Sequence, residues 1–332
     1  MTSTMSKRKA VAIVNPVARH GKGRELAQPA LEILSETFDI DVVETTYNGH
    51  ARELAYLVED GVDIFAVGGD GTVHEVLNGM LDSKKKESAL APVPTGSGND
   101  SARSLGLPLS PEAAAREIAK RRIRTIDVGL VNTHWYSNSL GLGMDARVAW
   151  EAMQLRRETS LKGVPLYLKA LANIISEWET YPLTIEVAGH TFEANITLLA
   201  VNIGRSYGGG FFVTPHAYID DGFFDCCLFE AIPAWQVWLR VPFLIPGRHE
   251  WMKKAHIFRT KELRVTCDRE ILVQLDGEVY PFKEGEMRLY ENALKVYAGE
   301  RGYFHEYASD DDPILPLAQF ALAPFEARKR PE

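Results

Sequence analysis

The first 130 residues alternate between short apolar runs and longer stretches with the apolar spacing of amphipathic helices. This alternation constrains the fold more than any other feature, because it is typical of βαβ units and predicts a parallel sheet flanked by helices. Ligands of such sheets bind outside the carboxyl ends of the strands. We expect strands within 9–16, 39–46, 62–71 and 88–100, and helices within 24–38, 49–61, 72–82 and 110–122.

The pattern changes after about Asp127, where strand-like runs are joined by short turns and one helical region is expected within 164–181. This arrangement predicts a β-sandwich. A chain of 332 residues is longer than one core usually serves, so two domains are expected. We place an α/β domain at 1–129 and a β-sandwich domain at 130–299. The tail, about 300–332, is expected to pack back on the first domain, with a disordered or partner-binding tail as the alternative.

Composition excludes several classes of protein. A formal net charge of −8 argues against a protein whose main task is nucleic-acid binding, since that affinity comes from neutralising phosphates. Three cysteines without a CxxC pair indicate a reducing compartment and buried thiols rather than a zinc site. No segment has the ~20 uninterrupted apolar residues of a membrane-spanning helix, and the N-terminus lacks the apolar length of a signal peptide. We expect a cytoplasmic protein with peripheral contact to the inner face of the membrane.

Two glycine-rich turns follow predicted strands, GGDG at 68–71 and PTGSGND at 94–100. Glycines allow a phosphate to approach backbone N–H groups, and the helix that follows presents its positive end. Neither turn is a GxGxxG or P-loop fingerprint, and each carries an acid. Carboxylates and phosphates can share a site when a hard cation such as Mg²⁺ binds both. Asp70, Asp100 and Asp127 are therefore candidates for an acidic shell, with a turn or cap role as the alternative for Asp127.

Several motifs in order resemble the catalytic domain of the diacylglycerol and sphingosine lipid kinases, in particular the soluble bacterial diacylglycerol kinase-like branch. The resemblance covers the chain to about Gly299 and rests on GGDGTVHEVLNGM, PTGSGNDSARSLGLP, NPVARHGKG, ETTYNGHARELA, LGLGMDA, GGGFFVTPHAYIDDGFFD and QLDGE. It implies a nucleotide domain related to those of phosphofructokinase and NAD kinase, a β-sandwich domain, and ATP in the cleft between them.

The resemblance also implies the roles of individual residues. Asp70, Asp100 and Asp127 match acids of a Mg²⁺ and water network at the phosphates. A second, structural metal site would use the carboxylate of Asp221 and the carbonyls of Tyr218 and Phe223, where spacing by itself favours an Asp-Gly turn. The contacts to ATP would come from Asn15, Thr45, Gly68, Gly69, Asp70, Gly71, Thr72, Val73, His74 and Ser97.

Phosphoryl transfer to an alcohol needs a group that accepts the hydroxyl proton. QLDGE matches the family's catalytic base element and supplies Asp276 and Glu278, of which Asp276 ranks slightly ahead. Without the other motifs, a plain Asp-Gly hairpin turn is the better interpretation. The first loop is longer than the family's usual form, so a phosphate contact of Lys22 stays open. His74 and Ser97 stand where asparagine and threonine are common.

The segment from Ala231 to Arg259 contains three tryptophans, large aliphatic residues and several basic residues. Such a composition fits a surface that contacts lipid headgroups, and it equally fits packing in a core. The segment 155–163 is a second basic candidate. We expect an ATP- and Mg²⁺-dependent lipid kinase acting on diacylglycerol. The alternatives are a sphingoid base or ceramide as acceptor, then NAD kinase, then a non-catalytic nucleotide- or lipid-binding protein. An exposed sheet edge would make a homodimer plausible.

Overall fold

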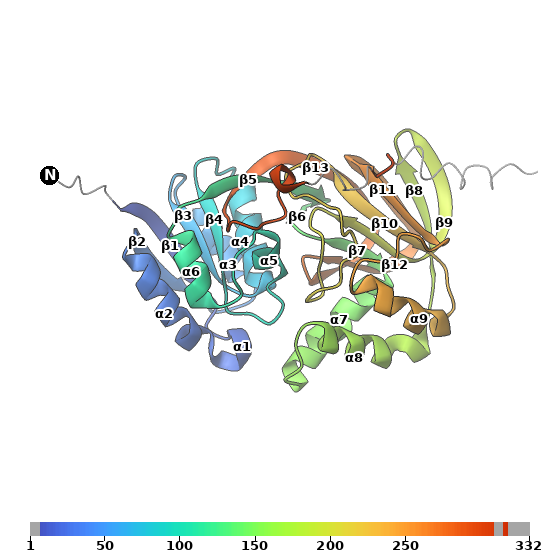
Figure 1. Cartoon of the computed structure of the whole chain (residues 1–332), viewed down its shortest axis with the longest axis horizontal. Coiled ribbons are helices and arrows are strands. Elements are labelled where there is room, and N and C mark those ends of the chain that lie inside the picture. Colours follow the sequence, from blue (N-terminus) through green and yellow to red (C-terminus); the bar gives the residue numbers. More distant parts are fainter. Residues whose placement is uncertain (1–6, 309–314, 318–332) are drawn as a thin grey trace, which may run out of the picture. The chain divides into compact units, whose positions relative to one another are not determined.

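The computed structural model describes residues 7–308 and 315–317, and the chain divides into two compact units (Figure 1). Unit 1 comprises Met1–Ile126 and Asn292–Gly302, and unit 2 comprises Asp127–Glu291 and Tyr303–Glu332. The first boundary lies close to the expected one at residue 129. The return of residues 292–302 to the first unit was not anticipated from the sequence.

Unit 1 is built on the expected parallel sheet, with strand order β2-β1-β3-β4 (Figure 1). The strands are β1 (Arg8–Val14), β2 (Phe38–Glu44), β3 (Asp63–Gly68) and β4 (Ala89–Pro94). β3 and β4 are buried at every position, which explains their continuous apolar character. The last residues of the long strand β13 (Glu278–Tyr297) extend this sheet, because Lys295 pairs in parallel with Ala89.

Helices α2, α3, α4 and α6 occur where the apolar spacing predicts them, whereas the short helices α1 and α5 were not predicted. Helix α2 packs with α6, and α3 packs with α4. Ser110 caps α6 by accepting a hydrogen bond from the Ala113 N–H at 3.4 Å. The helices are α1 (Ala18–Gly21), α2 (Gly23–Ser35), α3 (His50–Leu57), α4 (Asp70–Asp82), α5 (Asp100–Ser104) and α6 (Pro111–Ile118).

A buried charge network fixes the returning end of β13 within unit 1. Asp63 is fully buried, and its carboxylate accepts hydrogen bonds from Arg8, from the Tyr297 hydroxyl and from the Ala89 N–H. A buried carboxylate needs such partners, since an unpaired buried charge is very costly. Tyr297 therefore links the last strand to β1, β3 and β4.

Unit 2 is a mainly antiparallel β structure, in which β11-β10-β9-β7-β12-β13 lie in that order (Figure 1). β8 pairs with β9 and β12, and β5 pairs with β6 and β13. The strands are β5 (Ile123–Val131), β6 (His134–Tyr136), β7 (Leu140–Gly143), β8 (Tyr181–Val187), β9 (His190–Asn202), β10 (Phe224–Glu230), β11 (Ala255–Thr260) and β12 (Glu262–Leu275).

The expectation of one helical region in the second half of the chain was wrong. Besides α8 (Val164–Ile174), the described part of unit 2 contains α7 (Met144–Glu158) and α9 (Ala234–Leu244). The buried Ala146, Ala149, Ala152 and Leu155 recur every three residues, so a helical period was present in α7. Helix α9 lacks a comparable signal, because its eleven residues are apolar on nearly every side.

The three cysteines are free and buried, as expected. At the start of the tail, Glu300 pairs with Arg122 of unit 1 at 3.1 Å. Later described residues contact unit 2: the Ile219 N–H donates to the carbonyl of Tyr303 at 2.9 Å, and the Arg259 N–H to the carbonyl of Pro316 at 2.9 Å. The packing predicted for the tail falls largely on residues 309–314 and 318–332, which lie outside the described residues. Among the described helices, none has both the length and the apolar character to cross a membrane.

Candidate functional site

The two glycine turns contact each other at the carboxyl ends of β3 and β4. A Cβ added to Gly96 would lie 2.4 Å from the Cα of Gly69, so the two backbones meet at a distance that a side chain would prevent. Both Thr95 and Gly96 donate their N–H groups to the carbonyl of Gly68, at 2.9 and 3.2 Å. Glycine is required here because of close approach, and the contact brings both predicted phosphate turns to one edge of the sheet.

Helix α4 begins at Asp70, directly after this contact, with Gly69 as its cap. The first N–H groups of a helix have no partner within the helix, and its dipole favours negative charge there. The hydroxyl of the buried Thr95 has no hydrogen-bond partner among the described residues. The edge therefore offers several polar hydrogens of the kind that bind phosphate oxygens.

Asp70 and Asp100 both lie beside Gly98. A Cβ on Gly98 would be 2.8 Å from Asp70 Oδ2 and 3.5 Å from Asp100 Oδ2. Asp70 also accepts a hydrogen bond from the Ser101 N–H at 3.1 Å, while Asp100 pairs with Arg103. The structure thus brings together two of the three acids predicted for the Mg²⁺ site.

The first loop lies against the same turns. Asn15 donates its side-chain amide to the Thr72 hydroxyl at 3.2 Å, and the Thr45 N–H donates to the carbonyl of Val14, which precedes Asn15, at 2.9 Å. Arg19 donates from Nε to the carbonyl of Gly96 at 3.2 Å. Sequence reasoning considered Lys22 as the cation of this loop and missed Arg19, whereas Lys22 is exposed.

Other predicted residues of unit 1 are less available to a ligand. Val73 and His74 are 5% and 3% exposed, and the carbonyl of His74 accepts from the Asn78 side chain at 2.9 Å. Their side chains pack inside the unit, so a contact to ATP would come from their backbone. Ser97 and Gly71 remain partly exposed.

Asp127 belongs to unit 2, where it fixes the loop predicted as the second metal site. Its carboxylate accepts from the Gly222 N–H at 2.7 Å, and its own N–H donates to Ile219 at 2.8 Å. Within unit 2 it therefore has the turn-stabilising role that was held as its alternative.

The predicted second metal site already contains a cation from the chain. Asp221 Oδ2 lies 3.1 Å from Arg259 Nη1, and Asp225 Oδ1 lies 3.0 Å from Arg259 Nε. Burial raises the pKa of Asp225 to about 7, and the nearby guanidinium opposes this shift. The Phe223 ring lies under Lys261 and the Tyr218 ring under Arg205. No cluster of three acidic, histidine or cysteine side chains suited to a metal occurs among the described residues.

QLDGE forms a two-residue hairpin turn, as its Asp-Gly sequence predicts. Asp276 and Gly277 have φ values of +51° and +93°, and Leu275 pairs with Glu278 across the turn. The Asp276 carboxylate accepts three backbone N–H groups, from Ser137, Asn138 and Ser139, each at 2.9 Å. Asp276 is thereby held in one orientation, whereas Glu278 is half-buried at the strand end.

An apolar cavity of about 70 Å³ lies among α7, α8 and α9, and sequence reasoning missed it. Asp145 is the one acidic side chain in the cavity lining, and burial raises the pKa of its carboxyl group to about 6. Gln274 donates to Asp145 at 3.2 Å and accepts from the Gly277 N–H at 3.0 Å, so a single side chain joins the cavity to the QLDGE turn. The cavity lining comprises Met144, Asp145, Val148, Tyr167, Leu168, Leu171, Leu198, Tyr207, Gly208, Phe211, Val213, Val241 and Leu244.

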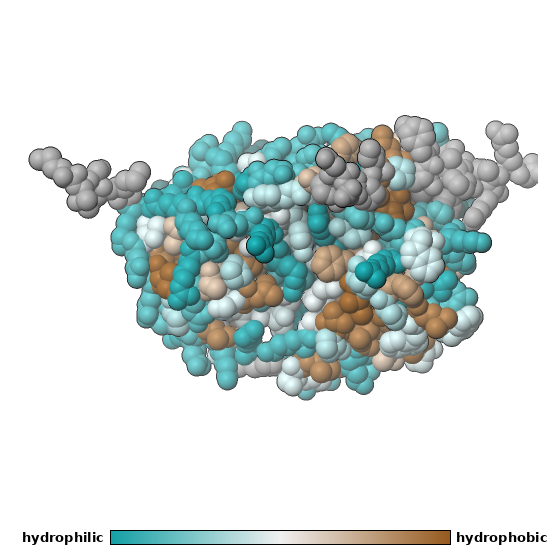
Figure 2. All heavy atoms as spheres, viewed as in Figure 1, coloured by the Kyte–Doolittle hydropathy of each residue, from teal (hydrophilic) through white to brown (hydrophobic). Residues whose placement is uncertain are grey.

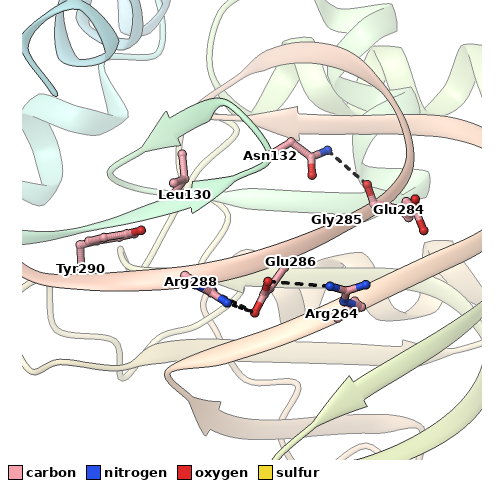
Figure 3. A pocket seen from close by; sticks show the side chains of 8 residues that line it. All are labelled: Leu130, Asn132, Arg264, Glu284, Gly285, Glu286, Arg288 and Tyr290. Carbon is pink, nitrogen blue, oxygen red and sulfur yellow. Dashed lines mark hydrogen bonds and ion pairs between the residues drawn. The ribbon is translucent and has the colours of Figure 1, made fainter. Parts of the chain in front are cut away.

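A polar hollow of about 390 Å³ lies elsewhere in unit 2, on β12 and β13 (Figure 3). Its charges are compensated internally, because Glu286 pairs with Arg288 at 2.8 Å and approaches Arg264 at 3.9 Å. It contains none of the predicted site residues, so its chemistry does not point to the reaction.

Comparisons with known proteins match two successive segments of the chain. Residues 9–131 match the model of the diacylglycerol kinase catalytic domain, and residues 138–298 match that of the YegS C-terminal NAD kinase beta sandwich-like domain. Diacylglycerol kinases of Mycobacterium tuberculosis (strain H37Rv) and Bacillus subtilis (strain 168) are each 28% identical over 306 residues. Those alignments cover 89% of this chain and 96% and 98% of the relatives.

A similar structure has also been solved. The crystal structure of a putative diacylglycerol kinase from Bacillus anthracis has a TM-score of 0.74 and 25% identity, over 90% of this chain and 98% of the other. The expected combination of an α/β domain and a β-sandwich-like domain is thereby confirmed.

The contact between the glycine turns predicts the effect of one methyl group. Gly96→Ala should weaken ATP binding at least tenfold and lower the thermal midpoint, because the Cβ and the Gly69 backbone cannot both keep their positions. Glu59→Ala, at an exposed position before β3 in the same unit and outside the two turns, serves as the control. Titration calorimetry with ATP checks the prediction, and equal affinities for the two variants would contradict it.

Asp145 predicts a pH-dependent stability. Its folded pKa of about 6 exceeds the ordinary value of 3.8, so between these values the folded protein holds a proton that the unfolded chain releases. The free energy of unfolding contributed by this group therefore falls as pH rises through that window. Relative to the wild type, Asp145→Asn should gain on the order of 2 kcal/mol between pH 4 and pH 7.

Urea unfolding at a series of pH values measures this difference, with Asp268→Asn at an exposed position of the same unit as the control. A constant difference between Asp145→Asn and the wild type across pH 4–7 would contradict the assignment.

Proposed function

We propose that this chain, which belongs to the diacylglycerol kinase family and is a lipid kinase that transfers phosphate to a hydroxyl, uses ATP with Mg²⁺ to phosphorylate diacylglycerol. The observation that carries the proposal is the contact between the two glycine turns, with Asp70 and Asp100 beside Gly98. It joins backbone donors for phosphates with two carboxylates in one unit.

The donor set at this edge fits a phosphate chain bound together with a hard cation. Mg²⁺ is usually held by one or two carboxylates together with substrate phosphates and waters, and a complete cage of protein ligands is unusual. Asp70 and Asp100 supply two carboxylates, and the start of α4 supplies N–H groups. When bound, Mg²⁺ would neutralise charge on the phosphates. Asn15, Thr45, Thr72 and Ser97 would orient the nucleotide.

In unit 2, the cavity and the QLDGE turn are arranged for an alcohol acceptor. We place an acyl chain of the lipid in the apolar cavity, with a free hydroxyl near Asp145, which Gln274 connects to the turn. Asp276 or Glu278 then accepts the hydroxyl proton as the oxygen attacks the γ-phosphorus, the bond to the bridging oxygen breaks and ADP leaves. Asp276 has the fixed orientation that a base benefits from, and Glu278 has the greater exposure.

The acceptor is tested by direct assay with diacylglycerol, sphingosine, ceramide and NAD, each in mixed micelles with ATP and Mg²⁺. Phosphatidic acid should be the main product. Phosphorylation of a sphingoid base or ceramide in its place would move the substrate assignment, and ATP binding without any phosphorylated acceptor would favour a non-catalytic binding protein on this fold.

Variants of Asp276 and Glu278 determine which of the two acids is the general base. Asp276→Asn should lower kcat by about 10²–10⁴ while ATP affinity stays within a few fold, because general-base catalysis contributes that much. Asn cannot accept all three backbone N–H groups in the same way, so the thermal midpoint is measured alongside. A folded Asp276→Asn enzyme with near-normal turnover, together with an inactive Glu278→Gln enzyme, would transfer the base to Glu278.

A further inference from the structure

The outer face of α9 and the loop after it form an exposed aromatic surface, which we call the tryptophan face. It comprises Trp235, Trp238, Leu239, Phe243 and Trp251, with exposures of 64%, 40%, 60%, 38% and 69%. The Phe243 and Trp251 rings are in edge-to-face contact with centroids 5.5 Å apart, so helix and loop present one continuous surface. Figure 2 shows apolar surface over the region of α7, α8 and α9.

The inner face of α9 already accounts for the packing of the helix. Val237 and Val241 are buried in the cluster that contains Leu155 of α7 and Leu166 of α8. In α9, Gln236 and Arg240 are the two residues that are not apolar. A surface helix ordinarily carries polar residues on its outer face, and a helix that is apolar on nearly every side is normally buried. The outer face of α9 therefore fits an apolar environment outside the protein.

The charges around this face identify the environment. The segment 231–254 contains four basic residues and one acidic residue, in a chain whose formal net charge is −8. Arg248 and Lys253 are exposed, and Glu250 is paired with His216 at 3.0 Å. Tryptophans suit the headgroup level of a bilayer, and lysine or arginine beside them is attracted to anionic lipids.

The tryptophan face and the apolar cavity share one helix. Val241 and Leu244 of α9 line the cavity, and Leu239 and Phe243 of the same helix face outward. A cavity of about 70 Å³ has room for little more than two water-sized groups, so an acyl chain requires the elements that line it to separate. A docking surface on α9 thus places one of these elements at the source of the lipid.

We propose that α9 and residues 245–254 form the membrane-docking surface, with an anionic bilayer as its partner. Trp235, Leu239 and Trp251 insert at the headgroup level, and Arg248 and Lys253 bind anionic headgroups. The purpose of this surface rests on the proposed function, because diacylglycerol resides in the bilayer. The test of the surface does not depend on catalysis.

The test measures sedimentation of the full chain with vesicles of equal parts phosphatidylglycerol and phosphatidylcholine. Trp235→Ser with Trp251→Ser should lower the partition coefficient at least about tenfold, since two large apolar side chains leave the interface. Arg248→Gln with Lys253→Gln should lower it about fivefold for each charge removed at low salt. The control is Tyr56→Ser with Leu57→Ser in unit 1, where exposures of 53% and 76% match those of the tryptophan face.

Several outcomes overturn the proposal: absence of vesicle binding by the wild type, equal binding by the tryptophan variant, or equal losses in the control. A wild-type dimer that the tryptophan substitutions dissociate, in a protein that does not bind vesicles, also overturns the proposal and assigns the face to a second copy of the chain.

An assay with short-chain diacylglycerol in free solution distinguishes a failure of the docking surface from a failure of the proposed function. A tryptophan variant that phosphorylates it normally but fails on vesicles supports the docking surface. Reduced vesicle binding with no lipid phosphorylated by either protein supports the surface and rejects the proposed function.

Discussion

The contact between Gly69 and Gly96 is the constraint on which the candidate site depends. Two buried parallel strands in register end at the same level, and the turns that follow can meet because neither carries a side chain at the contact. Asp70 and Asp100 start the next helices immediately afterwards, so the position of both acids follows from the same contact. The acid of the first turn is thus accompanied by a second acid from the neighbouring turn, as the proposed binding of phosphates together with a cation requires.

Much of unit 1 could be predicted from its sequence. Buried parallel strands have continuous apolar stretches and helices have a 3.6-residue period, so β1 to β4 and the helices α2, α3, α4 and α6 have local signals. The glycine turns were identified for the same reason, since close approach requires a residue type that is visible in the sequence. The hairpin at Asp276 and Gly277 was also readable, but the three N–H groups that hold Asp276 come from a segment about 138 residues earlier. That partner could not be found locally.

The features that escaped prediction depend on packing between distant segments. The cavity around Asp145 requires three helices, and α9 could not be distinguished from a loop because its apolar residues show no polar side. Gln274 lies within a quoted motif, yet its contacts to Asp145 and Gly277 exist only because β7 and β12 pair. Arg19 was overlooked in favour of Lys22, since the sequence does not show which residue of the loop reaches the Gly96 carbonyl.

The return of β13 to unit 1 has a consequence for how the chain is made. Tyr297 and the partners of β4 at Lys295 and Val296 are encoded after the whole segment from Asp127 to Glu291. A ribosome adds about 5–20 residues per second, so the Asp63 carboxylate waits roughly 10–50 s for the Tyr297 hydroxyl, which comes 234 residues later. During this interval β4 is an open sheet edge, a kind of surface that promotes association with other chains. Folding of unit 1 is therefore completed after most of unit 2 has been synthesised.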